Sequence, residues 1–214
     1  MSARLSRLST PVTAALFIGL TLVSFFASPD TPNSKASGTR VIAWFVAHRN
    51  TERVTDIISI FAMLFLVFFA GSLLGYLRRA PAAGSAAIVM LGGAVLIAAG
   101  FTVAVGIDYA LTDVPSRLAP SAAQALNVLD NDVFFTVPLG GAVFAIPAGI
   151  AILRGAALPK WLGWVAIVLG IVMCSPAFFP AFLVLLVWAL IVSILVYRRS
   201  DPLTPTPVPA VAGQ

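Results

Sequence analysis

Residues 57–77 read IISIFAMLFLVFFAGSLLGYL and are followed directly by Arg78 and Arg79. The run contains no charged residue, and roughly 20 apolar residues in a helix are enough to cross about 30 Å of hydrocarbon. This stretch therefore predicts a transmembrane helix that ends at a basic pair.

Four further charge-free runs cover residues 8–29, 80–107, 133–153 and 161–197. Each of the first three has the length of one spanning helix, whereas the last would form a single helix of about 55 Å. We expect this last run to fold back at Ser175, Pro176 and Pro180, because proline removes a backbone donor and restricts its neighbour. A single kinked span is the alternative.

The sequence thus predicts an all-α integral membrane bundle of six transmembrane helices. The composition agrees with this class, because 60% of the residues are hydrophobic and only 10% are charged. The predicted spans are residues 9–28, 55–77, 84–107, 132–153, 160–175 and 180–197. Together they form one domain, residues 1–200, and the proline-rich residues 201–214 are expected to be a disordered cytoplasmic tail.

The basic residues distribute unevenly between the two sides of the predicted bundle. One side holds eight basic residues and one acid, and the other holds five basic residues and seven acids. Because cytoplasmic loops carry an excess of lysine and arginine, this pattern predicts that both termini are cytoplasmic. A kinked single span at residues 161–197 would break the pattern. The net charge of +5 is therefore a topological bias and does not point to a nucleic-acid partner.

The first run allows two interpretations, since basic residues followed by an apolar stretch describe a signal peptide as well as an anchor. Phe25, Ser28 and Pro29 fit a processing site poorly, so we expect a retained first helix. Removal of this segment would leave five spans.

Small residues at four-residue spacing predict where the helices approach closely. Such stripes favour a compact bundle or a homo-oligomer, with the lipid bilayer and possibly a membrane protein as partners, and they carry no activity. The predicted packing positions are Gly71, Gly75, Ala98, Gly106, Gly141, Ala145 and Gly149.

A short apolar stretch, residues 41–47, precedes the second span and predicts an interfacial segment on the outer surface. His48, Glu52 and Asp56 follow it, and they share one face if the helix begins this early. They would then either pair with Arg49 and Arg53 at a helix start or form a carboxylate and imidazole site for a cation.

More acids lie at the same predicted level. Asp108 and Tyr109 close the third span, and Asp130 and Asp132 open the fourth. Carboxylates near hydrocarbon are costly unless they are paired or hydrated, so this group is a candidate ligand site. The alternative is that Arg53 and Arg117 neutralise it. The centres of the spans carry no titratable residue, which argues against a proton-coupled pump.

Signatures of soluble enzymes are missing from the sequence, so we expect no catalytic residue and no cofactor. The predicted function is a non-enzymatic membrane protein that binds a partner or a small ligand at its outer face. A small-solute transporter or channel is the first alternative, and a membrane-embedded metalloenzyme that uses His48 is the second.

Four stretches carry a family resemblance: SGTRVIAWFVAHRN, FFAGSLLGYLRR, SAAQALNVLDND and RGAALPKWLGW. Over residues 10–197 the chain resembles a large group of uncharacterised multi-pass membrane proteins of actinobacteria. The resemblance implies a six-helix protein of the cell membrane, and it brings no activity and no binding residues.

Overall fold

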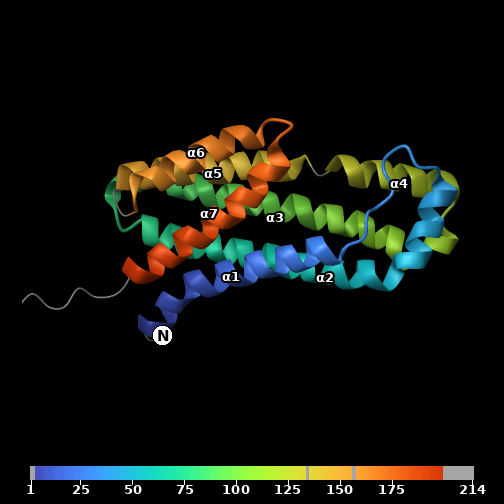
Figure 1. Cartoon of the computed structure of the whole chain (residues 1–214), viewed down its shortest axis with the longest axis horizontal. Helices are drawn as coiled ribbons and strands as arrows, with labels where there is room; N and C mark the ends of the chain where they lie inside the picture. The colour runs from blue at the N-terminus through green and yellow to red at the C-terminus, as the bar shows by residue number, and fades with distance from the viewer. Residues whose placement is uncertain (1–2, 134, 156–157, 200–214) are drawn as a thin grey trace, which may run out of the picture.

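The computed structural model describes residues 3–133, 135–155 and 158–199, and this part of the chain is built from helices without a strand (Figure 1). The predicted all-α fold is thereby confirmed. The predicted tail, residues 201–214, lies outside the described residues. The helices are α1 (Ala3–Ala27), α2 (Gly38–Leu77), η1 (Pro81–Ala83), α3 (Gly84–Asp113), η2 (Pro115–Arg117), α4 (Pro120–Val133), α5 (Thr136–Gly155), α6 (Lys160–Met173) and α7 (Phe178–Arg199).

Five helical segments are long and apolar enough to cross a membrane. They are α1 from Thr10 onward, α2, α3, the run of α4 and α5, and α7. In hydrocarbon a backbone must satisfy its own hydrogen bonds, which is why such charge-free runs form helices. The chain is therefore a helical membrane protein. The remaining predicted span forms α6, which has 14 residues and a length of about 21 Å, so the number of six crossings stays a prediction.

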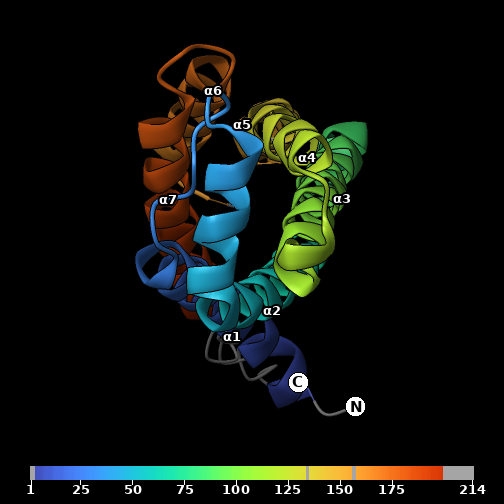
Figure 2. The ribbon, with the colours of Figure 1, turned by 90° about the vertical axis from the view of Figure 1, so that its right-hand side faces the viewer.

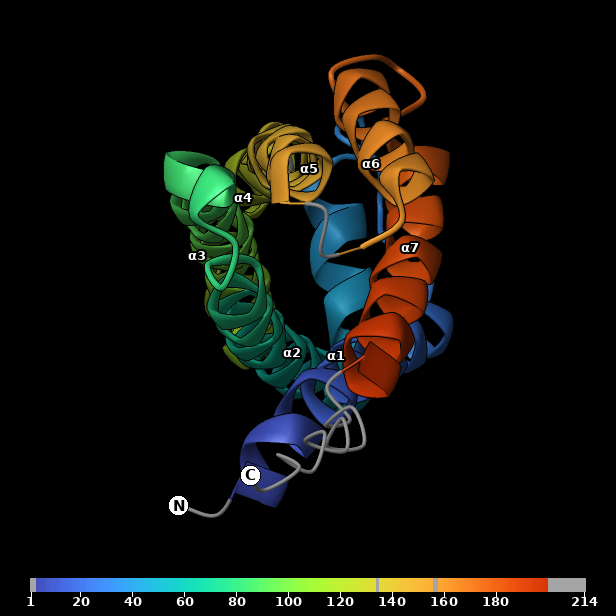
Figure 3. The same cartoon turned by 90° about the vertical axis from the view of Figure 1, so that its left-hand side faces the viewer.

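The long helices form a closed ring when viewed along the bundle (Figure 3). α2 packs against α1 and α3, α5 packs against α3 and α6, and α7 contacts both α6 and α1. Arg79, Arg154 and Arg198 follow or end their helices at the same end of this ring, which we call the basic end. The opposite end, which carries Asp108 and α4, is the acidic end.

The last charge-free run folds back as predicted. α6 ends at Met173 and α7 begins at Phe178, with Ser175 in the turn between them. The Ser175 hydroxyl donates to the Val172 carbonyl at 2.7 Å and accepts from the Ala177 amide at 3.2 Å. Pro180 lies in the first turn of α7, where its missing N–H costs nothing.

At the acidic end, α2 and α3 continue beyond α1 and α7, and α4 packs on this extension (Figure 1). The extension has a small core of its own, in which Val41 and Phe45 from the start of α2 contact Leu111 and Ala123. Residues 41–47 are thus the first turns of α2, packed against other helices, and their place at the outer membrane interface stays a prediction. Figure 2 shows these turns running across the end of the molecule.

The half of the bundle toward the basic end is tightly filled. Phe69, Leu73 and Trp188 are fully or almost fully buried in one continuous apolar core. The Trp188 indole donates to the Leu162 carbonyl at 3.0 Å and meets the Phe144 ring edge to face, with 6.2 Å between centroids. The one polar atom of this large side chain is therefore satisfied within the core.

Helices α3, α5 and α6 approach closely at glycines. A Cβ on Gly93 would collide with the backbone of Phe144, and one on Gly149 would collide with the carbonyl of Gly163. Among the predicted packing positions, Gly141 and Ala145 also lie in this interface. Ala98 is half-buried, and Gly71, Gly75 and Gly106 have open space where a side chain would project. The structure therefore does not require glycine at those three positions for a close approach of helices.

Candidate ligand site in a cavity at the acidic end

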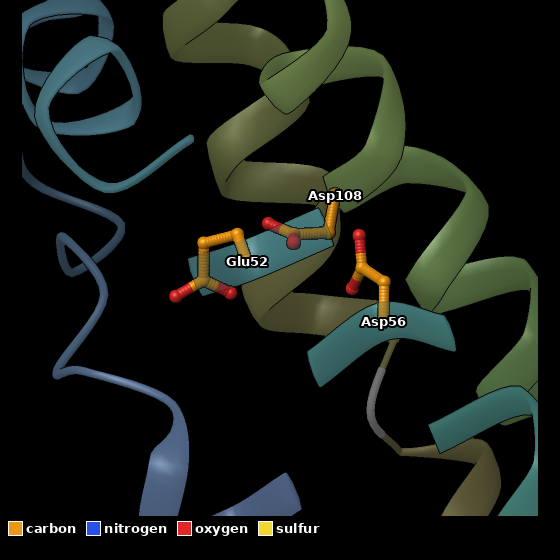
Figure 4. A group of neighbouring side chains, drawn as sticks. All are labelled: Glu52, Asp56 and Asp108. Atoms are coloured by element: carbon orange, nitrogen blue, oxygen red, sulfur yellow. The ribbon is translucent and has the colours of Figure 1, made fainter. Parts of the chain in front are cut away.

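Three carboxylates from two helices converge beside α1 (Figure 4). Glu52 and Asp56 are one turn apart on α2, so the helical repeat places them on one face. Asp108 reaches them from the antiparallel helix α3. One oxygen from each of the three groups lies within 4.8 Å of the other two, and the residues are only 3%, 6% and 8% exposed, respectively. We call these three residues the carboxylate cluster.

The rest of the chain offers few donors to the buried oxygens of this cluster. Oδ2 of Asp56 and Oδ1 of Asp108 are inaccessible to solvent and receive no donor from any other described residue, and the two carboxyl groups lie within hydrogen-bond reach of each other, where only a proton or a bound cation can join them. Glu52 accepts a bond from the Ser28 hydroxyl of α1, at 3.3 and 3.4 Å to its two oxygens. Buried polar atoms are almost always hydrogen-bonded, so unsatisfied carboxylate oxygens at such a site call for an explanation.

The neighbouring arginines do not neutralise the cluster. The Arg53 guanidinium pairs with the Asp113 carboxylate at 2.5 Å, and Arg49 reaches the same carboxylate at 3.8 Å and also bonds the Asp113 carbonyl. Arg117 lies in η2, and none of the ion pairs found among the described residues joins it to the cluster. The alternative in which Arg53 or Arg117 cancels the buried charge is therefore wrong.

Two of the residues predicted for the site lie apart from it. The His48 ring stacks on Trp44 at 4.4 Å between centroids, and its Nδ1 lies 2.9 Å from the Trp44 carbonyl. Tyr109 is exposed beneath the Arg53 guanidinium, which lies 5.9 Å from the ring centroid. In the part of the chain that the structure describes, the group suited to a metal ion consists of the three carboxylates without His48.

A cavity of about 770 Å³ opens beside the cluster, and we call it the acidic cavity. Asp130 and Asp132 of α4 also line it, and Asp130 interacts electrostatically with Glu52. Five of the seven residues predicted as ligands therefore lie on this cavity, and they come from three helices. Together with Asp30, six acids line this one space, so carboxyl groups are concentrated there in a low-dielectric environment.

The segment between α1 and α2 passes along the cavity. Pro29, Asp30 and Thr31 of this segment line the space. The side-chain amide of Asn127 donates to the Asn33 carbonyl at 3.0 Å, and that of Asn131 donates to the Pro32 carbonyl at 3.4 Å. The two asparagines of α4 thus tether this connection.

The sequence did not predict the other residues that line the cavity. Ser24 of α1 bonds the Ser59 hydroxyl of α2 at 2.5 Å, and both line the cavity. A serine pair at i and i+4 near the end of an otherwise apolar run, here Ser24 and Ser28, is the pattern that would have indicated a polar face. Phenylalanines of α1, α3 and α7 form the apolar wall, with Phe25 contacting Phe179 at 5.4 Å between ring centroids.

The polar lining stops before the basic end. Ser59 is the last buried polar residue of α2, and beyond it the cavity is bordered by Met63 and Phe101 before the apolar core begins. The other buried polar side chains of the described residues on that side are Thr10 and Ser193. The arrangement is a cavity lined by carboxyl groups, with hydroxyl groups along one wall and phenylalanines along another.

No protein-family model, curated protein or solved structure matches this chain. The roles of the residues above therefore rest on their geometry.

Proposed function

We propose that this membrane protein binds a small cationic ligand from its outer face, in the acidic cavity, without catalysing a reaction. The observation that carries the proposal is the carboxylate cluster, in which Asp56 and Asp108 lie side by side with buried oxygens to which no other described residue donates. Like charges this close cannot all remain ionised without a counter-charge, and a bound cation supplies that charge together with the missing bonds.

The proposed setting is the plasma membrane, with six crossings and both termini in the cytoplasm. The arginines at the basic end support this orientation, because positive residues are retained on the cytoplasmic side. The acidic cavity would then face outward. Binding is favoured over conduction because the polar lining ends near Ser59 and Thr21, and an ion pathway would need polar groups through the rest of the bundle.

A charge-selective labelling experiment tests the proposal without knowledge of the ligand. Ser28→Cys, in a Cys174→Ser background, places a thiol on the cavity wall beside Glu52. Intact cells are treated with membrane-impermeant methanethiosulfonate reagents of similar size, one cationic and one anionic. We expect the cationic reagent to react about tenfold faster or more, because a negative cleft concentrates cations. The ratio of the two rates cancels any change in the reactivity of the thiol.

Two further variants test whether the rate ratio depends on the carboxylate cluster. Asp56→Asn with Asp108→Asn should bring the ratio close to one. Asp113→Asn removes an acid from the same helix as Asp108, outside the cavity, and should leave the ratio high. Equal labelling rates for the two reagents in the Ser28→Cys protein would contradict the proposed site. A rate ratio that the double substitution does not change would contradict it as well. Labelling confined to inverted vesicles would contradict the orientation alone.

A further inference from the structure

The acidic cavity has two chemically different ends. Asp56 and Met63 are seven residues apart on α2, and Asp108 and Phe101 are seven residues apart on α3, which separates each pair by about 10 Å along its helix. All four residues line the same cavity. A ligand that fills the space must therefore present charge at one end and apolar surface at the other.

The apolar end is mostly aromatic. Phe101 comes from α3, and Phe178, Phe179 and Phe182 come from the first turns of α7, facing the cavity from the opposite side of the ring. A volume of about 770 Å³ with an apolar wall and a few convergent polar groups is typical of sites for organic molecules. A metal ion needs only its ligands and a few waters, so it would leave the aromatic wall without a role.

The geometry of the cluster also suits an ammonium group. An –NH₃⁺ group has three donors and no acceptor, which matches three carboxylates that need donors. With N–H···O distances near 2.8 Å and tetrahedral angles, the three acceptors lie about 4.6 Å from one another. One oxygen each of Glu52, Asp56 and Asp108 lies within 4.8 Å of the other two, which is close enough for all three residues to accept from one ammonium.

Building on the proposed function, we infer that the ligand is an amphiphilic amine about 10 Å long. Its ammonium group binds the carboxylate cluster, and its apolar body lies toward Met63 and against Phe101 and Phe182. Asp130 and Asp132 add negative charge around the cavity. The cluster selects for the cation, and the aromatic wall selects for the apolar body.

Calorimetric titration of the full-length protein in nanodiscs of zwitterionic lipid tests this inference. The probes are 4-phenylbutylammonium, its neutral analogue 4-phenylbutanol, methylammonium and Mn²⁺. We expect 4-phenylbutylammonium to bind at least about tenfold more tightly than 4-phenylbutanol, which lacks the charge-assisted bonds. Methylammonium should bind more weakly than 4-phenylbutylammonium because it cannot reach the aromatic wall. This comparison uses the unaltered chain and needs no variant to fold.

Two pairs of variants separate the ends of the site. Asp108→Asn should weaken 4-phenylbutylammonium about tenfold or more, and Asp113→Asn should not change its affinity. Phe182→Ala should weaken 4-phenylbutylammonium about three- to tenfold and leave methylammonium unchanged, and Phe68→Ala, at an exposed position of α2, should affect neither.

The outcomes distinguish the two proposals. Binding of Mn²⁺ that Asp108→Asn abolishes, without binding of 4-phenylbutylammonium, would overturn the amine and leave the cation site standing. Equal binding of amine and alcohol would overturn both proposals, and so would failure of all four probes to bind.

Discussion

The two halves of this bundle differ in how completely their buried polar groups are hydrogen-bonded. Toward the basic end, Phe69, Leu73 and Trp188 fill the interior, and the indole of Trp188 has its hydrogen bond. Toward the acidic end, Asp56 and Asp108 are nearly as buried, yet they lie side by side at the edge of a cavity, with oxygens to which no other described residue donates. Helix packing alone produces the first arrangement, because it maximises contact. The second is unfavourable for stability, and in our proposal a bound cation compensates for this cost.

The largest expected effect comes from a substitution at the centre of the packed half. Trp188→Ala should lower the free energy of unfolding by about 3–5 kcal/mol, because it opens a large void and removes the indole hydrogen bond to the Leu162 carbonyl. Chemical denaturation in detergent micelles measures this change. Trp164→Ala is the matched control, since that side chain is exposed and should cost less than about 1 kcal/mol. Similar losses at both positions would contradict a core centred on Trp188.

A smaller effect tests the close approach of α3 and α5. Gly93→Ala should destabilise the protein by about 2 kcal/mol, because the added Cβ collides with the backbone of Phe144, which cannot move as a side chain can. Gly71→Ala places the same methyl group in open space and should be neutral or slightly stabilising. The same denaturation assay compares them, and equal effects would show that the α3–α5 contact is looser than described.

The contrast between the halves also predicts a gain in stability. Asp108→Asn should raise the free energy of unfolding by about 1 kcal/mol when no cation is added, because it removes repulsion within the carboxylate cluster and supplies amide donors to Asp56. Asp56→Asn should act in the same direction. A loss of stability in both variants would mean that the cluster is structural.

The smallest effect concerns the arginine contacts outside the cavity. Asp113→Asn breaks the pairs with Arg49 and Arg53, whose side chains are 44% and 33% exposed, while that of Asp113 is 48% exposed. Solvent screens such pairs, so the expected loss is about 0.5 kcal/mol, and added salt should reduce the difference from the unaltered protein. A loss as large as that of Gly93→Ala would place this contact within the core of the fold.

Much of the packed half could be predicted from the sequence. Charge-free runs determine where helices form in lipid, and the length of residues 161–197 required a hairpin. The sequence could not predict which glycines contact another helix. Regular spacing places small residues on one face of a helix, but it does not identify the helix that packs against that face. Gly149 meets α6, whereas Gly71 and Gly75 carry the same spacing and face open space.

The acidic half was predictable only in part. Helical repeat placed Glu52 beside Asp56, and the antiparallel neighbour brought Asp108 to the same level. The repeat also placed His48 on that face, but stacking on Trp44 holds its ring away from the cluster. Asp113, one turn beyond Tyr109, forms the ion pair with Arg53. Which acid pairs with this arginine depends on side-chain geometry, which the sequence does not show. The sequence could not place the phenylalanines of α7 on the cavity wall, because it does not show that α7 packs next to α1.

Infrared difference spectroscopy of the carboxyl groups tests most directly whether the acidic half exists to hold a cation. Spectra of the protein in nanodiscs are recorded with and without 4-phenylbutylammonium or Mn²⁺. At least one of these cations should change the carboxyl and carboxylate bands of the unaltered chain and of Asp113→Asn, and the change should be absent when Asp56→Asn and Asp108→Asn are combined. A spectrum that neither cation alters, or a change that persists in the double variant, would contradict a cation site at the carboxylate cluster.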